Sequence, residues 1–299
     1  MPPAWWIDYI CMMDITWDEF VILAGPAITT SADGLWQPMT DARIKAVMPM
    51  APEGAWLFGE RGLAGRNPSY AGGVDRGDTE LFLVPNEYAA GLWRTAYPGA
   101  RVEVIGCPRL DELPPREPGP GPVVAVSFHW PASVAPESGT AIGWYSRALP
   151  ELASRFRVIG HAHPKGDWPR RAERIFRRSG IEFVRDFDDV CRQADVYACD
   201  NSSTLFEFAS TGRPVVVLNQ PAYRRRVHHG LRFWEASTVG VNVERPADLV
   251  AGVVRALEDR EADRQAREAA LHIVYAHRSG AAGRAAAAIA GYAMAEVAA

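Results

Sequence analysis

Two serines follow a short apolar stretch in the second half of the chain. Residues 195–199 (DVYAC) predict a buried strand, and the tetrapeptide D-N-S-S at 200–203 separates it from a predicted helix. Backbone N–H groups at the start of a helix, together with the hydroxyls of Ser202 and Ser203, suit a phosphate group. The same hydroxyls can also simply cap the helix, so these residues alone leave both interpretations open.

The spacing downstream of the serines favours the interpretation that they bind a phosphate group. Glu207 lies seven residues before Pro214 in E-F-A-S-T-G-R-P. This stretch resembles the E-A-x-x-x-G-x-P pattern of nucleotide-sugar enzymes with the GT-B fold. The resemblance implies that Glu207 binds the ribose of a nucleotide donor and that the small residues ahead of it hold the diphosphate. Glu207 falls one turn into the predicted helix, which agrees with that arrangement.

Two more stretches narrow the resemblance to a single family of enzymes. H-A-H-P-K-G at 161–166 ends a predicted strand with a His-Pro pair, and G-C-P-R-L-D stands at 106–111 after another predicted strand. Together with D-N-S-S, these motifs resemble the CDP-glycerol glycerophosphotransferase family over residues from about 81 to 260. The resemblance implies that His163 contacts a donor phosphate and that Ser202 and Ser203 contact the other phosphate oxygens.

The resemblance also assigns roles to three further residues. It implies that Arg109 and Asp111, at the junction of two domains, organise the cleft. His161 ends a core strand beside His163, and it either assists donor binding or is merely structural.

The chain departs from the family at the expected catalytic base. The family carries a His-Gly pair in its first domain, whereas the corresponding stretch here is WLFGERGLAGR, with Phe58 before Gly59. Phenylalanine cannot accept a proton. Either Glu60, the nearest carboxylate, takes the role of the base, or the acceptor and the reaction differ.

A basic loop follows the last predicted core strand. YRRRVHHG at 223–230 contains three arginines and two histidines. Arginine forks match phosphate oxygens, so Arg226 is a candidate for binding an anionic donor. A solvated basic loop is the alternative.

The second half of the chain predicts a parallel sheet covered on both faces, because apolar strands alternate with amphipathic helices. Strands are expected at 123–128, 157–163, 181–184, 195–199 and 214–218, and helices at 141–154, 171–180, 188–194 and 204–212. From Pro246 the chain is expected to be helical in three pieces. The first half predicts a less regular α/β domain with strands at 20–25, 43–50, 80–85 and 101–106 and a helix at 87–97.

Five prolines and two glycines in LPPREPGPGP, residues 113–122, predict a break between domains. We therefore expect an acceptor-side domain at 1–113, a linker at 114–122, a donor-binding domain at 123–279, and a C-terminal helix at 280–299 that packs back on the first domain. With the resemblance, the fold class is α/β: two Rossmann-like domains of the GT-B type that face a cleft.

Composition and charge argue against several classes of protein. The formal net charge of −4 gives no support to nucleic acid as a partner, although a nucleic acid acceptor is not excluded. No stretch is long and apolar enough to predict a membrane span. The four cysteines are scattered, which predicts reduced thiols in a cytoplasmic protein and neither a metal site nor disulfides. No cofactor is expected, since the nucleotide-diphosphate donor is a substrate.

These features together predict an enzyme. The expected reaction transfers a sugar or polyol-phosphate group from a nucleotide-activated donor such as CDP-glycerol to a hydroxyl acceptor. Two alternatives stay open: an enzyme similar to UDP-N-acetylglucosamine 2-epimerase, which uses the same fold, and a nucleotide-binding protein without turnover.

Overall fold

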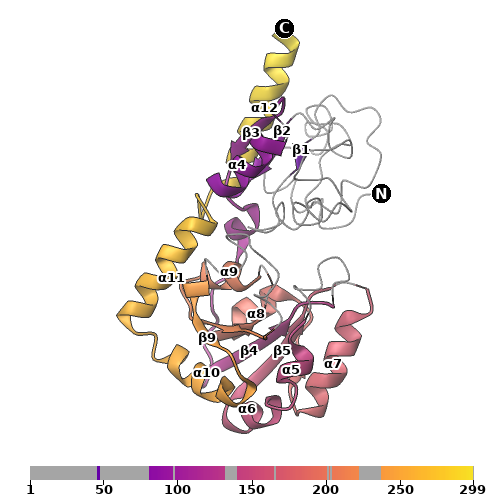
Figure 1. Ribbon diagram of the computed structural model, residues 1–299, viewed down its shortest axis with the longest axis vertical. Helices are drawn as coiled ribbons and strands as arrows, with labels where there is room; N and C mark the ends of the chain where they lie inside the picture. The colour runs from indigo at the N-terminus through magenta and orange to yellow at the C-terminus, as the bar shows by residue number, and fades with distance from the viewer. Residues whose placement is uncertain are drawn as a thin grey trace. The chain divides into compact units, whose positions relative to one another are not determined.

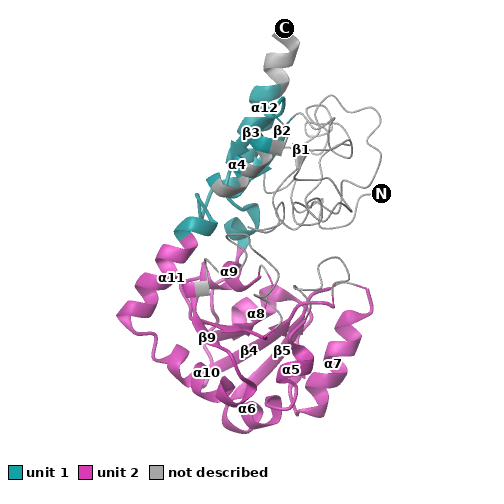
Figure 2. Ribbon diagram, in the orientation of Figure 1, with its two compact units in different colours: residues 1–112, 272–299 teal, residues 113–271 magenta. Residues whose placement is uncertain are grey.

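The computed structural model describes residues 46–47, 81–96, 98–131, 140–164, 166–200, 202, 204–221 and 237–298. The chain forms two compact units (Figure 2): unit 1 comprises residues 1–112 and 272–299, and unit 2 comprises residues 113–271. The sequence placed the corresponding divisions after residues 113, 122 and 279. In the structure the Pro/Gly-rich stretch belongs to unit 2.

Unit 2 is built on a parallel sheet. In the described part of this unit six strands lie in the order β6-β5-β4-β7-β8-β9. Their bounds are β4 (Val123–Phe128), β5 (Arg157–Ala162), β6 (Glu182–Phe183), β7 (Val196–Cys199), β8 (Val215–Leu218) and β9 (Val241–Val243). All neighbouring pairs are parallel, which confirms the predicted sheet. The short strand β9 was not predicted from the sequence.

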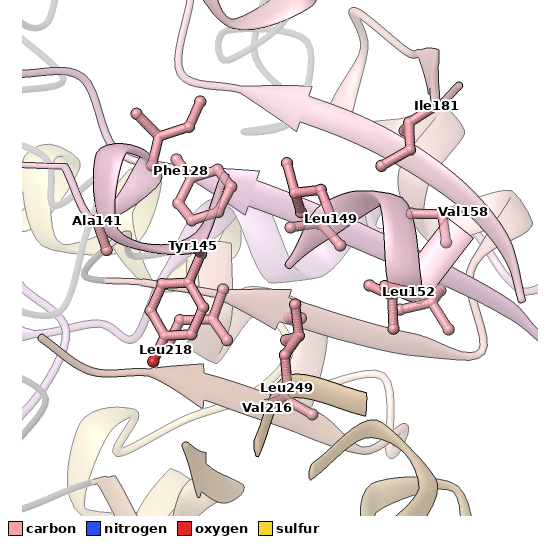
Figure 3. Packing of buried hydrophobic residues seen from close by; sticks show 14 of the residues in the cluster. Phe128, Ala141, Tyr145, Leu149, Leu152, Val158, Ile181, Val216, Leu218 and Leu249 are labelled. Carbon is pink, nitrogen blue, oxygen red and sulfur yellow. The ribbon is translucent and has the colours of Figure 1, made fainter. Parts of the chain in front are cut away.

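Helices cover both faces of this sheet (Figure 1). One face is apolar along every strand and packs against α5 (Ile142–Tyr145), α6 (Leu149–Arg155), α7 (Trp168–Arg178) and α10 (Leu249–Leu257). Figure 3 shows Phe128, Tyr145, Leu149 and Val216 in this layer. The other face carries polar side chains near the carboxyl ends of the strands, and rings from α8 (Phe187–Gln193) and α9 (Thr204–Ala209) contact it.

The expected helix at 141–154 is divided into α5 and α6. Pro150 stands in the first turn of α6, and a proline cannot donate the backbone hydrogen bond that a continuous helix needs there. The chain turns between the two helices, and α6 then begins with proline in its first turn, where proline is tolerated. The three predicted C-terminal helices are confirmed as α10, α11 (Glu261–Val274) and α12 (Ala281–Ala298).

The Pro/Gly-rich segment is anchored to unit 2. Arg116 donates from Nε and Nη2 to the two carboxylate oxygens of Asp195, both at 3.0 Å. Asp195 also accepts the backbone N–H of Val123 at 2.8 Å, at the start of β4. Burial raises the pKa of Asp195, but the hydrogen bonds from Arg116 and Val123 outweigh it, so the pKa lies below its usual value. The segment therefore has fixed contacts at its centre.

Unit 1 contains a parallel sheet in the order β1 (Ala46–Val47), β2 (Leu81–Val84), β3 (Arg101–Val104). Helix α4 (Glu87–Ala96) connects β2 to β3, and the short 3-10 helix η3 (Pro108–Glu112) follows β3. The strand expected at 20–25 lies outside the described residues.

The C-terminal part of the chain belongs to unit 1, as predicted. The Ala276 N–H donates to Pro85 O at 3.0 Å, and Asn86 Nδ2 donates to Val274 O at 2.7 Å. Gly106 adopts a φ of +89°, and an added Cβ would lie 2.5 Å from His277 O. Only glycine therefore permits this close approach after β3.

Candidate functional site

The strand order of unit 2 defines where a ligand can bind. Numbered along the chain from β4 to β9, the strands lie in the order 3-2-1-4-5-6, so the direction of winding reverses between β4 and β7. In open parallel sheets the connections on either side of such a point leave a crevice beyond the carboxyl ends of the strands, and ligands bind there. The residues that follow β4, β5 and β7 are therefore the candidates.

Asp200 organises this edge of the sheet. Directly after β7, its Oδ1 accepts the His129 N–H at 2.7 Å and its Oδ2 accepts the Ala141 N–H at 2.8 Å. These two amides stand at the two ends of the connection between β4 and α5. Asp200 is only 1% exposed. No role was predicted for Asp200 from the sequence, although a carboxylate immediately after a buried strand is a signal for one.

Ser202 lies in the turn between β7 and α9, as expected. It is 5% exposed, and its Oγ accepts a hydrogen bond from Thr204 Oγ1 at 2.9 Å. Thr204 Oγ1 is in turn 2.8 Å from the hydroxyl of Tyr197 on β7. Helix α9 has only six residues, Thr204–Ala209, so its dipole contributes little to an anion site here. The hydroxyl groups carry more of the expected phosphate chemistry than the helix does.

Glu207 lies on the fourth residue of α9 and is 5% exposed. The other residues of the helix from Leu205 to Ala209 are also buried, and all of them are apolar. Burial of a carboxylate costs free energy unless other interactions compensate, and Glu207 has an interaction within the chain. The ribose contact of Glu207 stays a prediction.

His161 ends β5 inside the unit. Its Nδ1 is 3.1 Å from Ser127 Oγ on β4, and the two residues are opposite each other in the register of the sheet. Its ring lies 5.7 Å from the Phe187 ring. Burial, together with nearby His163, lowers the pKa of His161 to about 4, and Asp186 partly opposes this shift. His161 is therefore neutral at pH 7 and serves as a hydrogen-bonding group.

His163 joins a group of rings beyond the ends of β4 and β5. Its ring centroid is 5.8 Å from that of His129 and 6.4 Å from that of Trp130, and the His129 and Trp130 rings stack at 5.6 Å. The three rings are half-buried. The structure thus places His163 at the predicted edge of the sheet, on the side of β4 away from Ser202.

Arg109 and Asp111 lie in η3 of unit 1. Asp111 Oδ2 accepts the Ala282 N–H at 2.9 Å, in the first turn of α12. A carboxylate at that position satisfies one of the free N–H groups of the helix start. In the structure Asp111 therefore fixes the C-terminal helix to unit 1, and the expected cleft role of both residues stays a prediction.

The remaining candidates Glu60, Ser203 and Arg226 lie outside the described residues, as does Phe58. Among the described residues no group of three or more His, Cys, Asp or Glu side chains is arranged to hold a metal ion. None of the helices in the described part of the chain is long and apolar enough to cross a membrane.

Solved structures resemble this chain at low sequence identity. A structure described as a putative UDP-N-acetylglucosamine 2-epimerase from Listeria monocytogenes matches with a TM-score of 0.54 and 16% identity, over 98% of this chain and 81% of that one. Sucrose-phosphate synthase from Thermosynechococcus elongatus matches with a TM-score of 0.48 and 15% identity, over 99% and 80%. The wall teichoic acid polymerase TagF matches with a TM-score of 0.49 and 13% identity, over 73% and 58%.

The match spans less than two thirds of the polymerase structure. No protein-family model matches the chain, and a search of curated proteins finds no match. The likeness to the epimerase structure, together with the parallel sheets, confirms the predicted fold class: mixed α/β of the GT-B type.

Proposed function

We propose that the chain is a GT-B-type transferase that moves a sugar or polyol-phosphate group from a nucleotide-diphosphate-activated donor to a hydroxyl acceptor. Unit 2 binds the donor at the carboxyl ends of β4, β5 and β7. This assignment includes the predicted glycosyltransferase or glycerophosphotransferase activity, with CDP-glycerol as one donor to test. As part of the same proposal, the protein acts in the cytoplasm.

The buried carboxylate of Glu207 is the observation that carries the proposal. It stands one turn after Ser202, at the edge where ligands bind in parallel sheets. The two hydroxyls of a ribose are donors that a carboxylate accepts, and the turn ahead of it offers hydroxyl donors to phosphate oxygens. One short segment therefore holds complementary partners for both parts of a nucleotide diphosphate.

Catalysis in this proposal relies on stabilising charge on the leaving nucleotide, which is a nucleoside diphosphate for sugar transfer and a nucleoside monophosphate for polyol-phosphate transfer. Ser202, Ser203 and His163 contact its oxygens, and Arg226 adds a cation. A general base activates the acceptor hydroxyl, and Glu60 is the candidate. No cofactor takes part, because the activated donor supplies the driving force.

Calorimetric titration tests the donor site. Glu207→Gln is expected to weaken binding of the tightest nucleoside diphosphate among CDP, UDP, GDP and dTDP by about tenfold or more, because one acceptor for the ribose is lost. Binding of inorganic pyrophosphate should change little. Glu182→Gln, an exposed glutamate on β6, is the matched control. Equal losses for nucleotide and pyrophosphate would mean that Glu207 supports the fold and contacts no ribose.

A UDP-N-acetylglucosamine 2-epimerase-like activity is the second candidate, since the structure with a TM-score of 0.54 is described as a putative enzyme of that kind. Product analysis separates the candidates. Epimerisation inverts C2 of UDP-N-acetylglucosamine and leaves the sugar bonded to UDP, whereas transfer releases the nucleotide and requires an acceptor hydroxyl. A nucleotide-binding protein without turnover gives tight binding and no product with any of the donors.

A further inference from the structure

A row of polar groups runs through the interior of unit 2 from β5 to the Ser202 turn. His161 Nδ1 is 3.1 Å from Ser127 Oγ, the Tyr197 hydroxyl is 2.8 Å from Thr204 Oγ1, and Thr204 Oγ1 donates to Ser202 Oγ at 2.9 Å. The His161–Ser127 pair and the connected hydroxyls of Tyr197, Thr204 and Ser202 are thus two hydrogen-bonded groups. We refer to Tyr197, Thr204 and Ser202 as the hydroxyl row.

The sheet itself positions the hydroxyl row. Ser127 is opposite His161 on β5, and Ala125, two residues earlier on the same face of β4, is opposite Tyr197 on β7. Ser127, His161 and Tyr197 therefore share the face that α8 and α9 cover. Tyr197 is fully buried, and its ring stacks on Phe208 at 5.2 Å and meets Phe187 edge-on at 5.8 Å. These contacts fix the direction of the Tyr197 hydroxyl.

The hydrogen bonds in the hydroxyl row have one direction. Each hydroxyl carries a single proton, and Thr204 uses its proton for Ser202. Thr204 must then accept from Tyr197. Both of these protons therefore point toward Ser202.

This direction leaves the proton of Ser202 for a ligand. Ser202 is 5% exposed, and among the residues that the structure describes none accepts its hydroxyl proton. Because its oxygen already accepts from Thr204, Ser202 presents a donor to whatever lies beyond the turn. A phosphate oxygen accepts and never donates, so it matches this arrangement.

We propose that Thr204 and Tyr197 are positioning residues that hold the Ser202 hydroxyl as a donor to the donor diphosphate. This inference rests on the proposed function, since it specifies how one of its phosphate contacts is oriented. Tyr197 and Ser202 are buried and Thr204 is half-buried, and hydrogen bonds in such a setting polarise one another. A donor whose direction is fixed before the ligand arrives needs no rearrangement on binding.

The test compares Thr204→Val with Thr204→Ser. Valine has the shape of threonine without the donor, whereas serine keeps the hydroxyl. Calorimetry with the nucleoside diphosphate that binds most tightly is expected to show a loss of about five- to thirtyfold for Thr204→Val and near wild-type affinity for Thr204→Ser. Tyr197→Phe keeps both ring contacts and should lose about threefold. Urea unfolding of each variant verifies the fold, and equal affinity of Thr204→Val and wild type would overturn the inference.

The two proposals fail in different ways. If the wild type binds none of the four nucleoside diphosphates, the proposed function is wrong, and pyrophosphate then takes the place of the nucleotide in the comparison of the Thr204 variants. Weaker pyrophosphate binding by Thr204→Val than by Thr204→Ser supports the role of the hydroxyl row. Equal binding, or no pyrophosphate binding by the wild type, overturns it.

Discussion

The charge state of His161 links the interior of unit 2 to the stability of the whole chain. Burial lowers its pKa to about 4 from an ordinary value of 6.5. Between these two pH values the unfolded chain binds a proton that the folded chain does not bind. The free energy of unfolding therefore falls as the pH is lowered from about 6.5 to about 4, and the contribution of His161 is fully present only above that range.

The expected size of this effect is roughly 3 kcal/mol for a shift of this extent. We expect urea unfolding of the wild type to show a steeper loss of stability between pH 6.5 and 4 than that of His161→Gln, which has no ionisable group at this position. Other groups titrate equally in the two proteins, so the difference between their pH profiles of unfolding free energy reports the titration of His161. Parallel pH profiles would mean that His161 is protonated in the folded chain.

At the residue scale, the sequence could predict where site residues lie in the fold better than which hydrogen bonds they make. The spacing from Ser202 to Pro214 placed Ser202 and Glu207 correctly in the turn after β7 and in the helix that follows. The hydrogen bonds of Thr204 and Tyr197 could not be predicted, because they depend on which face of the sheet each side chain occupies. That face follows from the strand register, which the sequence alone does not specify.

At the scale of elements, Asp200 connects two loops through backbone amides. Asparagine has the same shape but one acceptor oxygen, so Asp200→Asn leaves either His129 N–H or Ala141 N–H facing an NH₂ group. We expect a loss of about 2 to 3 kcal/mol in the free energy of unfolding, measured with urea.

Asp186→Asn is the matched control for this substitution. Asp186 accepts one exposed backbone N–H, from Asp188 at 2.9 Å, as the N-cap of α8. Asparagine caps helices as well as aspartate does, so the change should stay within about 0.5 kcal/mol. Equal effects of the two substitutions would show that Asp200 contributes no more than an ordinary helix cap.

A close approach of α7 to β5 gives a second prediction at this scale. A Cβ on Gly160 would lie 2.5 Å from Phe176 Cγ, so Gly160→Ala forces the ring to move. We expect a loss of about 1 to 3 kcal/mol from overpacking, which Phe176→Leu in the same chain should partly restore. Additive effects in the double-mutant cycle would contradict a direct contact.

The elements show what periodicity can and cannot predict. The strands and helices of unit 2 were predictable because a parallel sheet buried on both faces needs continuous apolar strands. Strand β9 was missed because three residues, of which only Val243 is fully buried, give too short a pattern. The break between α5 and α6 lies just before Pro150. Proline is tolerated in the first turn of a helix but not in its interior, so the sequence alone does not specify where the new helix begins.

At the scale of the whole molecule, the chain leaves unit 1 after residue 112 and returns to it at residue 272. The return is secured within unit 1: Arg284 Nε donates to Ile105 O at 2.9 Å, and Asp111 accepts the Ala282 N–H. Up to residue 292, the buried residues of α12 are Ala281, Ala282, Ala285 and Ile289. The alanine-rich composition predicted a helix, but only the tertiary contacts show what it packs against.

Removal of α12 should therefore destabilise unit 1. Deletion of residues 281–299 exposes apolar surface worth on the order of 4 kcal/mol. We expect hydrogen exchange to become faster in peptides covering β2 and β3, while peptides covering β4 and β7 serve as an internal control and stay protected. Unchanged exchange in β2 and β3 would mean that α12 contributes nothing to the stability of unit 1.

The central claim is that a nucleoside diphosphate binds at the carboxyl ends of β4, β5 and β7. Hydrogen exchange followed by mass spectrometry, with and without a saturating nucleoside diphosphate, tests it most directly. The account predicts new protection in peptides covering residues 127–131, 161–164 and 199–209, and its loss in Ser202→Ala at the same nucleotide concentration. Protection confined to other parts of the chain, or equal protection in Ser202→Ala, would contradict the account.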